Sequence, residues 1–108
     1  MTVTREEFWA LQAKAMTEKQ VQAAGDKIAR DSGWLCYHTW ISARSDKGFP
    51  DSVYLRGPQG IVAEYKREGK QPTDAQYEWL NAFKGAGFEA YLWRPSDLLG
   101  GRIAVALQ

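Results

Sequence analysis

The sequence has a single cysteine and lacks long runs of apolar residues. Because the lone Cys36 has no partner within the chain, a disulfide framework and a multi-cysteine zinc site are both excluded. No apolar run approaches the roughly 18 residues that a membrane-spanning helix needs. Charged residues occur at the N-terminus before any apolar stretch forms, which is unlike a secretory signal. We therefore expect a cytosolic protein without a membrane partner.

A strong charge of one sign is also missing. The chain carries 14 Lys and Arg against 13 Asp and Glu, for a net charge of +1, whereas a passive nucleic-acid binder is typically strongly basic. The 108 residues, 44% of them hydrophobic, allow one domain that buries roughly 65% of its unfolded surface. Such a domain needs no metal or disulfide to complete its core.

Helical signals are present near the N-terminus. Thr4 and Thr17 each precede apolar residues at helical spacing, as N-cap residues do. The pattern fits either two helices or one helix with a break near Met16 and Thr17. Gly33 is a natural position for the end of the second segment.

Strand signals dominate the middle of the chain. Four segments rich in β-branched and aromatic residues are expected to form strands: Trp34–Trp40, Ser52–Leu55, Ile61–Lys66 and Phe88–Trp93. A loop is expected over Ser42–Gly48, and a hairpin turn over Gly57–Gly60. Thr73 is typical of an N-cap for a helix that ends at Gly85 or Gly87.

The order of these elements predicts an α/β fold. The hairpin requires an antiparallel pair, and the later strand–helix–strand unit favours a parallel pair with a right-handed crossover. We therefore expect a mixed sheet of about four strands flanked by helices on both faces. A last short element follows Pro95, and Gly100–Gly101 is a natural interruption of it.

Three charged residues are expected to meet at one edge of this sheet. Pairing about a turn centre between Pro58 and Gln59 places Asp51 opposite Lys66, and strand alternation puts Glu64 on the same face as Lys66. Neighbouring carboxylates repel unless a cation lies between them, and Mg²⁺ binds carboxylates together with water and phosphate oxygens. An adjacent ammonium can stabilise charge on phosphorus, so the cluster suits metal-assisted phosphodiester hydrolysis. The alternative is a cross-strand ion pair beside ordinary turn chemistry.

The same residues carry a resemblance to a known family. Pro50–Asp51 followed by Glu64–Tyr65–Lys66 resembles the motif of the PD-(D/E)xK nuclease superfamily. Further residues resemble its VRR-NUC branch, the virus-type replication-repair nucleases, over about Thr17–Leu98. They are Thr17–Glu18, Gln22, Ala29, Gly33–Trp34, Tyr37–His38, Gly48–Phe49, Thr73, Gln76, Trp79–Leu80 and Trp93–Asp97.

The resemblance implies a small restriction-endonuclease-like sandwich and a metal-dependent DNA endonuclease. It implies that Asp51 and Glu64 bind Mg²⁺ or Mn²⁺ with the Tyr65 backbone carbonyl, and that Lys66 is the catalytic lysine. Glu18 would complete the metal or water shell. The implied catalytic residues are thus Glu18, Asp51, Glu64, Lys66 and Gln76. Five basic residues are candidates for DNA contacts: Arg44, Lys47, Arg67, Lys70 and Arg94.

Several of these residues have a structural alternative. Glu18 lies in a first helical turn, where any acid is favoured by the helix dipole, and Gln76 has the position of a capping-box partner of Thr73. His38 has the alternative of a hydrogen-bonded core histidine. Ser52 replaces a residue that is usually apolar in the family, which could loosen the hairpin. Four tryptophans are expected in the core or an interface rather than on bases: Trp9, Trp40, Trp79 and Trp93.

The expected organisation is an extra helix over residues 1–16, a nuclease-like domain over 17–98 and a tail over 99–108 packed on that domain. The resemblance implies branched DNA, such as a four-way (Holliday) junction, as substrate and a homodimer as the active form. The first helix carries the large apolar residues Phe8, Trp9 and Leu11, which need to be buried. We therefore expect a dimer contact there. A phage origin would place the protein in the host cytoplasm. The alternatives are a non-catalytic nucleic-acid-binding or protein-interaction module on the nuclease fold and an unrelated small α/β protein with a protein partner.

Overall fold

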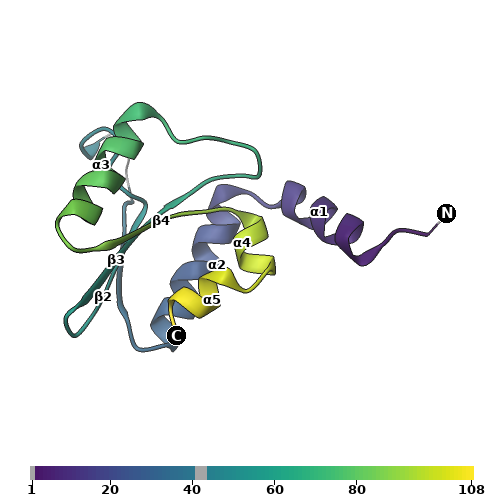
Figure 1. Ribbon diagram of the computed structural model, residues 1–108, viewed down its shortest axis with the longest axis horizontal. Helices are drawn as coiled ribbons and strands as arrows, with labels where there is room; N and C mark the ends of the chain where they lie inside the picture. The colour runs from purple at the N-terminus through teal and green to yellow at the C-terminus, as the bar shows by residue number, and fades with distance from the viewer. Residues whose placement is uncertain (1, 41–43) are drawn as a thin grey trace.

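The computed structural model describes residues 2–40 and 44–108, so the loop expected over Ser42–Gly48 lies partly outside the described residues. The described elements, in chain order, are α1 (Arg5–Ala15), α2 (Glu18–Asp31), β1 (Leu35–His38), β2 (Ser52–Arg56), β3 (Gln59–Tyr65), α3 (Asp74–Gly85), β4 (Glu89–Trp93), α4 (Pro95–Leu99) and α5 (Arg102–Ala106). Figure 1 shows their arrangement in space.

The first two helices are separate. The backbone leaves the helical conformation at Met16 and Thr17, which decides between the two arrangements that the sequence allows. Thr17 then caps α2 through a capping box with Gln20, in which each side chain binds the other residue's backbone N–H. Since this box satisfies free N–H groups at the start of α2, the break costs little.

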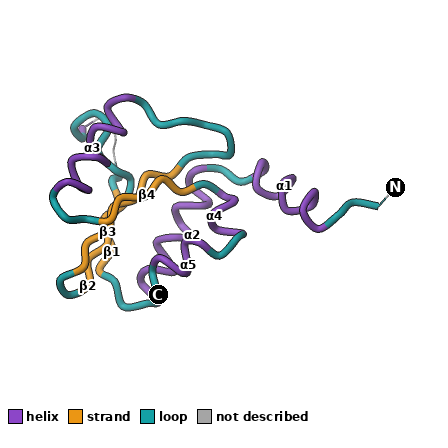
Figure 2. The backbone as a smooth tube through the Cα atoms, in the orientation of Figure 1, coloured by secondary structure: helices purple, strands orange, loops and turns teal. Residues whose placement is uncertain are grey.

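The sheet has the predicted mixed topology. Its strand order is β1-β2-β3-β4, with the first two pairings antiparallel and β3 parallel to β4. Helix α3 makes the crossover between the parallel strands and covers one face, whereas α2, α4 and α5 cover the other (Figure 2). The α/β prediction is therefore confirmed.

The hairpin register differs from the predicted one by two residues. Arg56 pairs with Gln59 and Ser52 with Ala63, so the turn is centred between Gly57 and Pro58 rather than one residue later. Gly57 adopts a φ of +58°, and the proline ring fixes a negative φ at the next position. This sequence of signs is the one that a type II′ hairpin turn needs. Continued by one residue, the register places Asp51 beside Glu64 rather than beside Lys66.

The core lies between the sheet and α2. Ile61, Ala63 and Tyr65 point from β3 into this core and are fully buried. Gly25 lets α2 approach the sheet closely, because a Cβ at this position would lie 2.0 Å from the Tyr65 hydroxyl. On the opposite face an aromatic cluster packs beneath α3, with Phe83 in contact with Phe49, Trp79 and Phe88.

The two ends of the chain are arranged differently. Ile103 and Leu107 are fully buried, and the Trp34 indole donates to the Leu107 carbonyl at 2.9 Å, so the C-terminal tail is part of the core. Helix α1 instead extends away from the body (Figure 1). Among the described elements, α4 is the one that it packs against extensively. Within residues 2–40 and 44–108, none of the helices has the length and apolar character required to cross a membrane.

Candidate active site at the sheet edge

The structure brings Asp51, Glu64 and Lys66 together at one edge of the sheet. Glu64 is only 2% exposed although it is an acid, and the Lys66 ammonium lies 3.6 Å from its Oε2 atom. The Asp51 carboxyl is close enough to Glu64 for the two groups to interact directly. Burial of two neighbouring acids with one lysine leaves negative charge that is only partly compensated.

Asp51 is fixed by its own carboxylate and by its backbone. The Tyr65 backbone N–H donates to Asp51 Oδ2 at 2.8 Å. The Asp51 carbonyl accepts from the Thr39 N–H at 2.9 Å and from Gln22 Nε2 at 3.2 Å. The backbone of Asp51 is therefore held by α2 and by the residue that follows β1, and its side chain is held by β3. Gln22, one of the residues that carry the resemblance, thus supports the backbone of Asp51.

Gln76 makes the predicted capping box and also contacts Glu64. Its Oε1 accepts from the Thr73 N–H at 2.8 Å in a capping box at the start of α3, and its Nε2 donates to Glu64 Oε2 at 3.1 Å. The same amide thus connects the helix cap to the acid. Both Gln76 and Lys66 approach Oε2, whereas the buried Glu64 Oε1 has no hydrogen-bond partner among the described residues.

The electrostatics of the pair favour the uptake of a positive charge. Burial raises the pKa of Glu64 to about 9; the Asp51 charge adds to this rise, and Lys66 opposes it. Burial also raises the pKa of Asp51, although the Tyr65 N–H, Glu64 and Lys66 lower it. At neutral pH the metal-free site is therefore expected to hold a proton between the two acids. A divalent cation with oxygen ligands would satisfy the same need.

The raised pKa of Glu64 makes the free energy of unfolding depend on pH in the absence of metal. Unfolded glutamate releases its proton near pH ~4.3, whereas folded Glu64 retains it to about pH 9. The folded state thus binds more protons in this window, and the free energy of unfolding falls as the pH rises through it. Urea unfolding in EDTA at pH 5, 7 and 9 is expected to give decreasing midpoints. E64Q, which resembles the protonated acid, should largely remove this dependence; an equal slope in both proteins would contradict the assignment.

Glu18 lies near the pair without completing a cluster of ligands. Its charge raises the pKa of both Asp51 and Glu64. Among residues 2–40 and 44–108, however, no three His, Cys, Asp or Glu side chains are grouped as metal ligands. A cation held by Asp51 and Glu64 would therefore need water or a backbone oxygen, such as the implied Tyr65 carbonyl, to fill its coordination sphere.

The basic residues proposed for DNA contacts fall into two groups. Arg44, Lys47 and Lys70 are exposed. The guanidinium groups of the other two bind backbone: Arg94 donates to the Lys70 carbonyl at 2.7 Å, and Arg67 donates to the Lys14 carbonyl at 3.3 Å. These contacts position the segments around the site, and DNA contact by all five residues stays a prediction.

A buried polar network behind the site is the main feature that the sequence did not reveal. Asp26 is 3% exposed, and its Oδ1 accepts from the Ser52 and Tyr54 hydroxyls at 2.8 and 2.6 Å. The Tyr54 and Tyr65 hydroxyls are 2.6 Å apart, and His38 Nδ1 lies 3.3 Å from Asp26 Oδ2. Ser52 therefore anchors the hairpin to α2 rather than loosening it. The available signal was the spacing of Glu18, Gln22 and Asp26, which puts all three on one face of α2.

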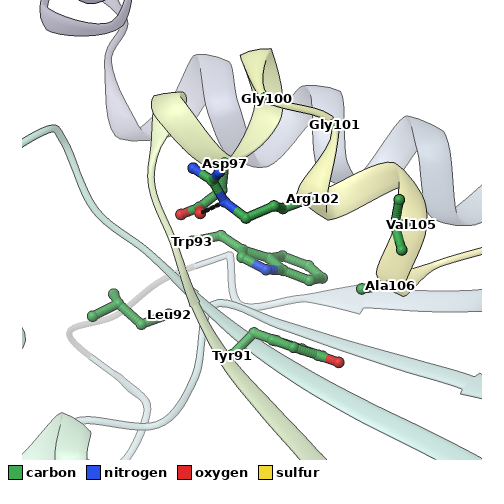
Figure 3. A pocket seen from close by; sticks show the side chains of 9 residues that line it. All are labelled: Tyr91, Leu92, Trp93, Asp97, Gly100, Gly101, Arg102, Val105 and Ala106. Carbon is green, nitrogen blue, oxygen red and sulfur yellow. Dashed lines mark hydrogen bonds and ion pairs between the residues drawn. The ribbon is translucent and has the colours of Figure 1, made fainter.

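A cavity of about 450 Å³ lies elsewhere and does not belong to this site. It is bordered by β4, α4 and α5, and the ion pair between Arg102 and Asp97 lies at its side, with Trp93 stacked on Tyr91 below (Figure 3). None of the candidate catalytic residues lines it. The acids at the sheet edge, and not this apolar cavity, define the candidate active site.

The comparisons with known proteins agree with this fold. No protein-family model and no curated protein matches the sequence. Among solved structures, the chain is similar to one described as a "VRR_NUC domain protein", with a TM-score of 0.60 and 20% sequence identity over 86% of this chain and 91% of that chain. The chain therefore has the fold of a VRR_NUC domain, which confirms the restriction-endonuclease-like sandwich that its motifs imply.

Proposed function

We propose that the protein is a metal-dependent DNA endonuclease. The observation that carries the proposal is the buried Asp51–Glu64 pair, in which Glu64 Oε1 has no hydrogen-bond partner among the described residues and Lys66 lies beside it. Ionisation of this buried oxygen without a donor would be costly, and a bound cation would offset that cost. The similarity in fold to a VRR_NUC domain protein supports the same chemistry.

In this proposal Asp51 and Glu64 hold Mg²⁺ or Mn²⁺, with the Tyr65 carbonyl as a further ligand. The bound ion would supply Lewis-acid activation of the scissile phosphate. A water oxygen attacks phosphorus and gives up one proton to the solvent, the bond to the leaving oxygen breaks, and that oxygen takes up a proton from the solvent. The Lys66 ammonium orients the water or stabilises the charge that grows on the phosphate oxygens. Gln76 holds Glu64 in place, and Glu18 adds to the water shell.

Branched DNA, such as a four-way junction, is the substrate that the resemblance favours. The test is to incubate the protein with single-stranded, linear duplex, flapped and four-way DNA of matched sequence, with Mg²⁺, Mn²⁺ or EDTA. We expect cleavage that requires metal and is fastest on the branched substrates. Binding without metal-dependent cleavage would instead favour the alternative of a non-catalytic nucleic-acid-binding module.

We also propose that α1 forms a homodimer contact, so that two active sites act on one branched substrate. Phe8 and Leu11 are 53% and 61% exposed, which is unusual for large apolar side chains on one short helix. A chain beginning at Met16 is then expected to elute as a monomer where the full chain elutes as a dimer. The double variant F8S/L11S should do the same without shortening the chain. An unchanged oligomeric state in both would exclude α1 as the contact.

A further inference from the structure

A second cavity adjoins the candidate active site, on the side of β1 that faces α2. Its volume is about 370 Å³, near the lower end of the range of about 300–1,000 Å³ that is usual for small-ligand pockets. Its lining includes Lys19, Gln22, Asp26, His38, Thr39 and Trp40. The candidate catalytic residues do not line it, so the proposed hydrolysis does not account for it.

Two hydrogen-bonded residues connect this cavity directly to Asp51. Thr39 donates its N–H to the Asp51 carbonyl at 2.9 Å, and its hydroxyl lies 3.1 Å from the Pro50 carbonyl. Gln22 donates to the Asp51 carbonyl and to Ser52 Oγ. The same two residues therefore line the cavity and hold the backbone of Asp51.

Trp40 gives the cavity an aromatic surface. It was expected in the core or an interface, but its side chain is 78% exposed. Its ring centroid lies 4.1 Å from that of His38, and His38 is itself oriented by Asp26, with 3.3 Å between Nδ1 and Oδ2. An exposed tryptophan beside a fixed imidazole provides a flat face for another ring.

The polar groups around this aromatic surface suit a nucleotide. Lys19 can neutralise a phosphate at the border of the cavity, while the amide oxygen of Gln22 and the remaining nitrogen of His38 can bind the edge of a base. A base within a duplex has both faces covered by its neighbours, whereas an unpaired base can stack on an aromatic side chain. A base that stacks on Trp40 would therefore have to be unpaired.

We infer that this cavity binds the unpaired nucleobase of the nucleotide adjoining the scissile phosphate, with Trp40 as its stacking surface. The inference rests on the proposed function for the identity of that phosphate. It extends that function by giving a physical reason for selecting branched DNA, since branch points and single strands expose unpaired bases.

The test uses the full chain and oligonucleotides that carry the fluorescent base 2-aminopurine. In EDTA, the wild-type protein should quench the fluorescence of a single-stranded oligonucleotide through stacking. W40A should lose this quenching and bind the single strand about 5- to 150-fold more weakly, because stacking on an aromatic side chain is worth roughly 1–3 kcal/mol. W40F should retain most of both effects, and affinity for matched duplex should change little.

The matched control is Y37A. Like Trp40, Tyr37 is an exposed aromatic residue, at 59%, but within β1 it alternates with His38, which lines the cavity, and it does not line the cavity itself. It should therefore quench and bind like the wild type. Equal losses in W40A and Y37A, or no loss in W40A, would overturn the inference, as would an absence of quenching by the wild-type protein.

The outcomes also separate this inference from the proposed function. If the wild-type protein cleaves DNA with Mn²⁺ but W40A binds and cleaves normally, the cavity assignment is wrong and the nuclease stands. If Trp40-dependent quenching occurs but no metal supports cleavage, the cavity assignment stands and the nuclease is wrong. Binding in EDTA thus tests the cavity without relying on turnover.

Discussion

Replacing Lys66 by alanine is expected to reduce the rate of metal-dependent DNA cleavage by about 10²–10³-fold, the usual loss when one group that stabilises transition-state charge is removed. Its ammonium lies 3.6 Å from Glu64 Oε2 and is only 12% exposed, so solvent cannot take its place effectively. DNA affinity should change much less, because Lys66 acts mainly on charge that develops during hydrolysis. Single-turnover cleavage with saturating protein measures this rate directly.

Lys27→Ala provides the control for the loss of a positive charge. Lys27 pairs with Asp31 on the exposed side of α2 and makes none of the contacts of the active site. Its removal should leave both the rate and the affinity unchanged. Should K66A cleave at the wild-type rate while K27A is also unaffected, Lys66 would have no catalytic role, and its contact with Glu64 would be a simple ion pair.

Replacing Gly25 by alanine is expected to destabilise the protein by about 2–4 kcal/mol, because overpacking and the loss of a buried hydrogen bond act together. The added Cβ would lie 2.0 Å from the Tyr65 hydroxyl and 2.9 Å from its Cζ. Tyr65 is fully buried and bound to Tyr54, so its ring has no free space to enter. Thermal unfolding should show a melting temperature lower by roughly 10–25 °C.

Gly85→Ala is the matched substitution. Gly85 is also a helical glycine, the last residue of α3, but a Cβ there would meet no atom within 4 Å. This change should leave stability unaltered or increase it by up to about 1 kcal/mol. The double variant G25A/Y65F should recover part of the loss, since it removes the nearest atom. Similar melting temperatures for G25A and G85A would refute the close approach of α2 to the sheet.

The convergence of Asp51, Glu64 and Lys66 was predictable even though the hairpin register was not. Side chains alternate along a strand with a period of two, so a register error of two residues leaves every side chain on its predicted face. The error arose because the conformation of Gly57 decides where the turn lies. The observed register makes Glu64, rather than Lys66, the neighbour of Asp51 on the adjacent strand. This register brings the two acids together.

Helical spacing places Asp26 on the same face of α2 as Glu18 and Gln22, but local patterns do not reveal its partners. An aspartate in the middle of a helix is usually solvated, whereas Asp26 binds Ser52 and Tyr54 in a strand far along the chain. The position of Trp40 had the same difficulty. Its exposure depends on what packs beside β1 in space, whereas its residue type favours burial.

The bond between the Tyr65 N–H and Asp51 Oδ2 has a consequence for the affinity of the site for metal. This carboxylate accepts a backbone N–H as though it were part of the ladder between two strands. Its rotamer is therefore already selected before any ion arrives, and little side-chain entropy remains to be lost on coordination. Metal affinity should accordingly depend on competition between ion and proton rather than on the ordering of a flexible ligand.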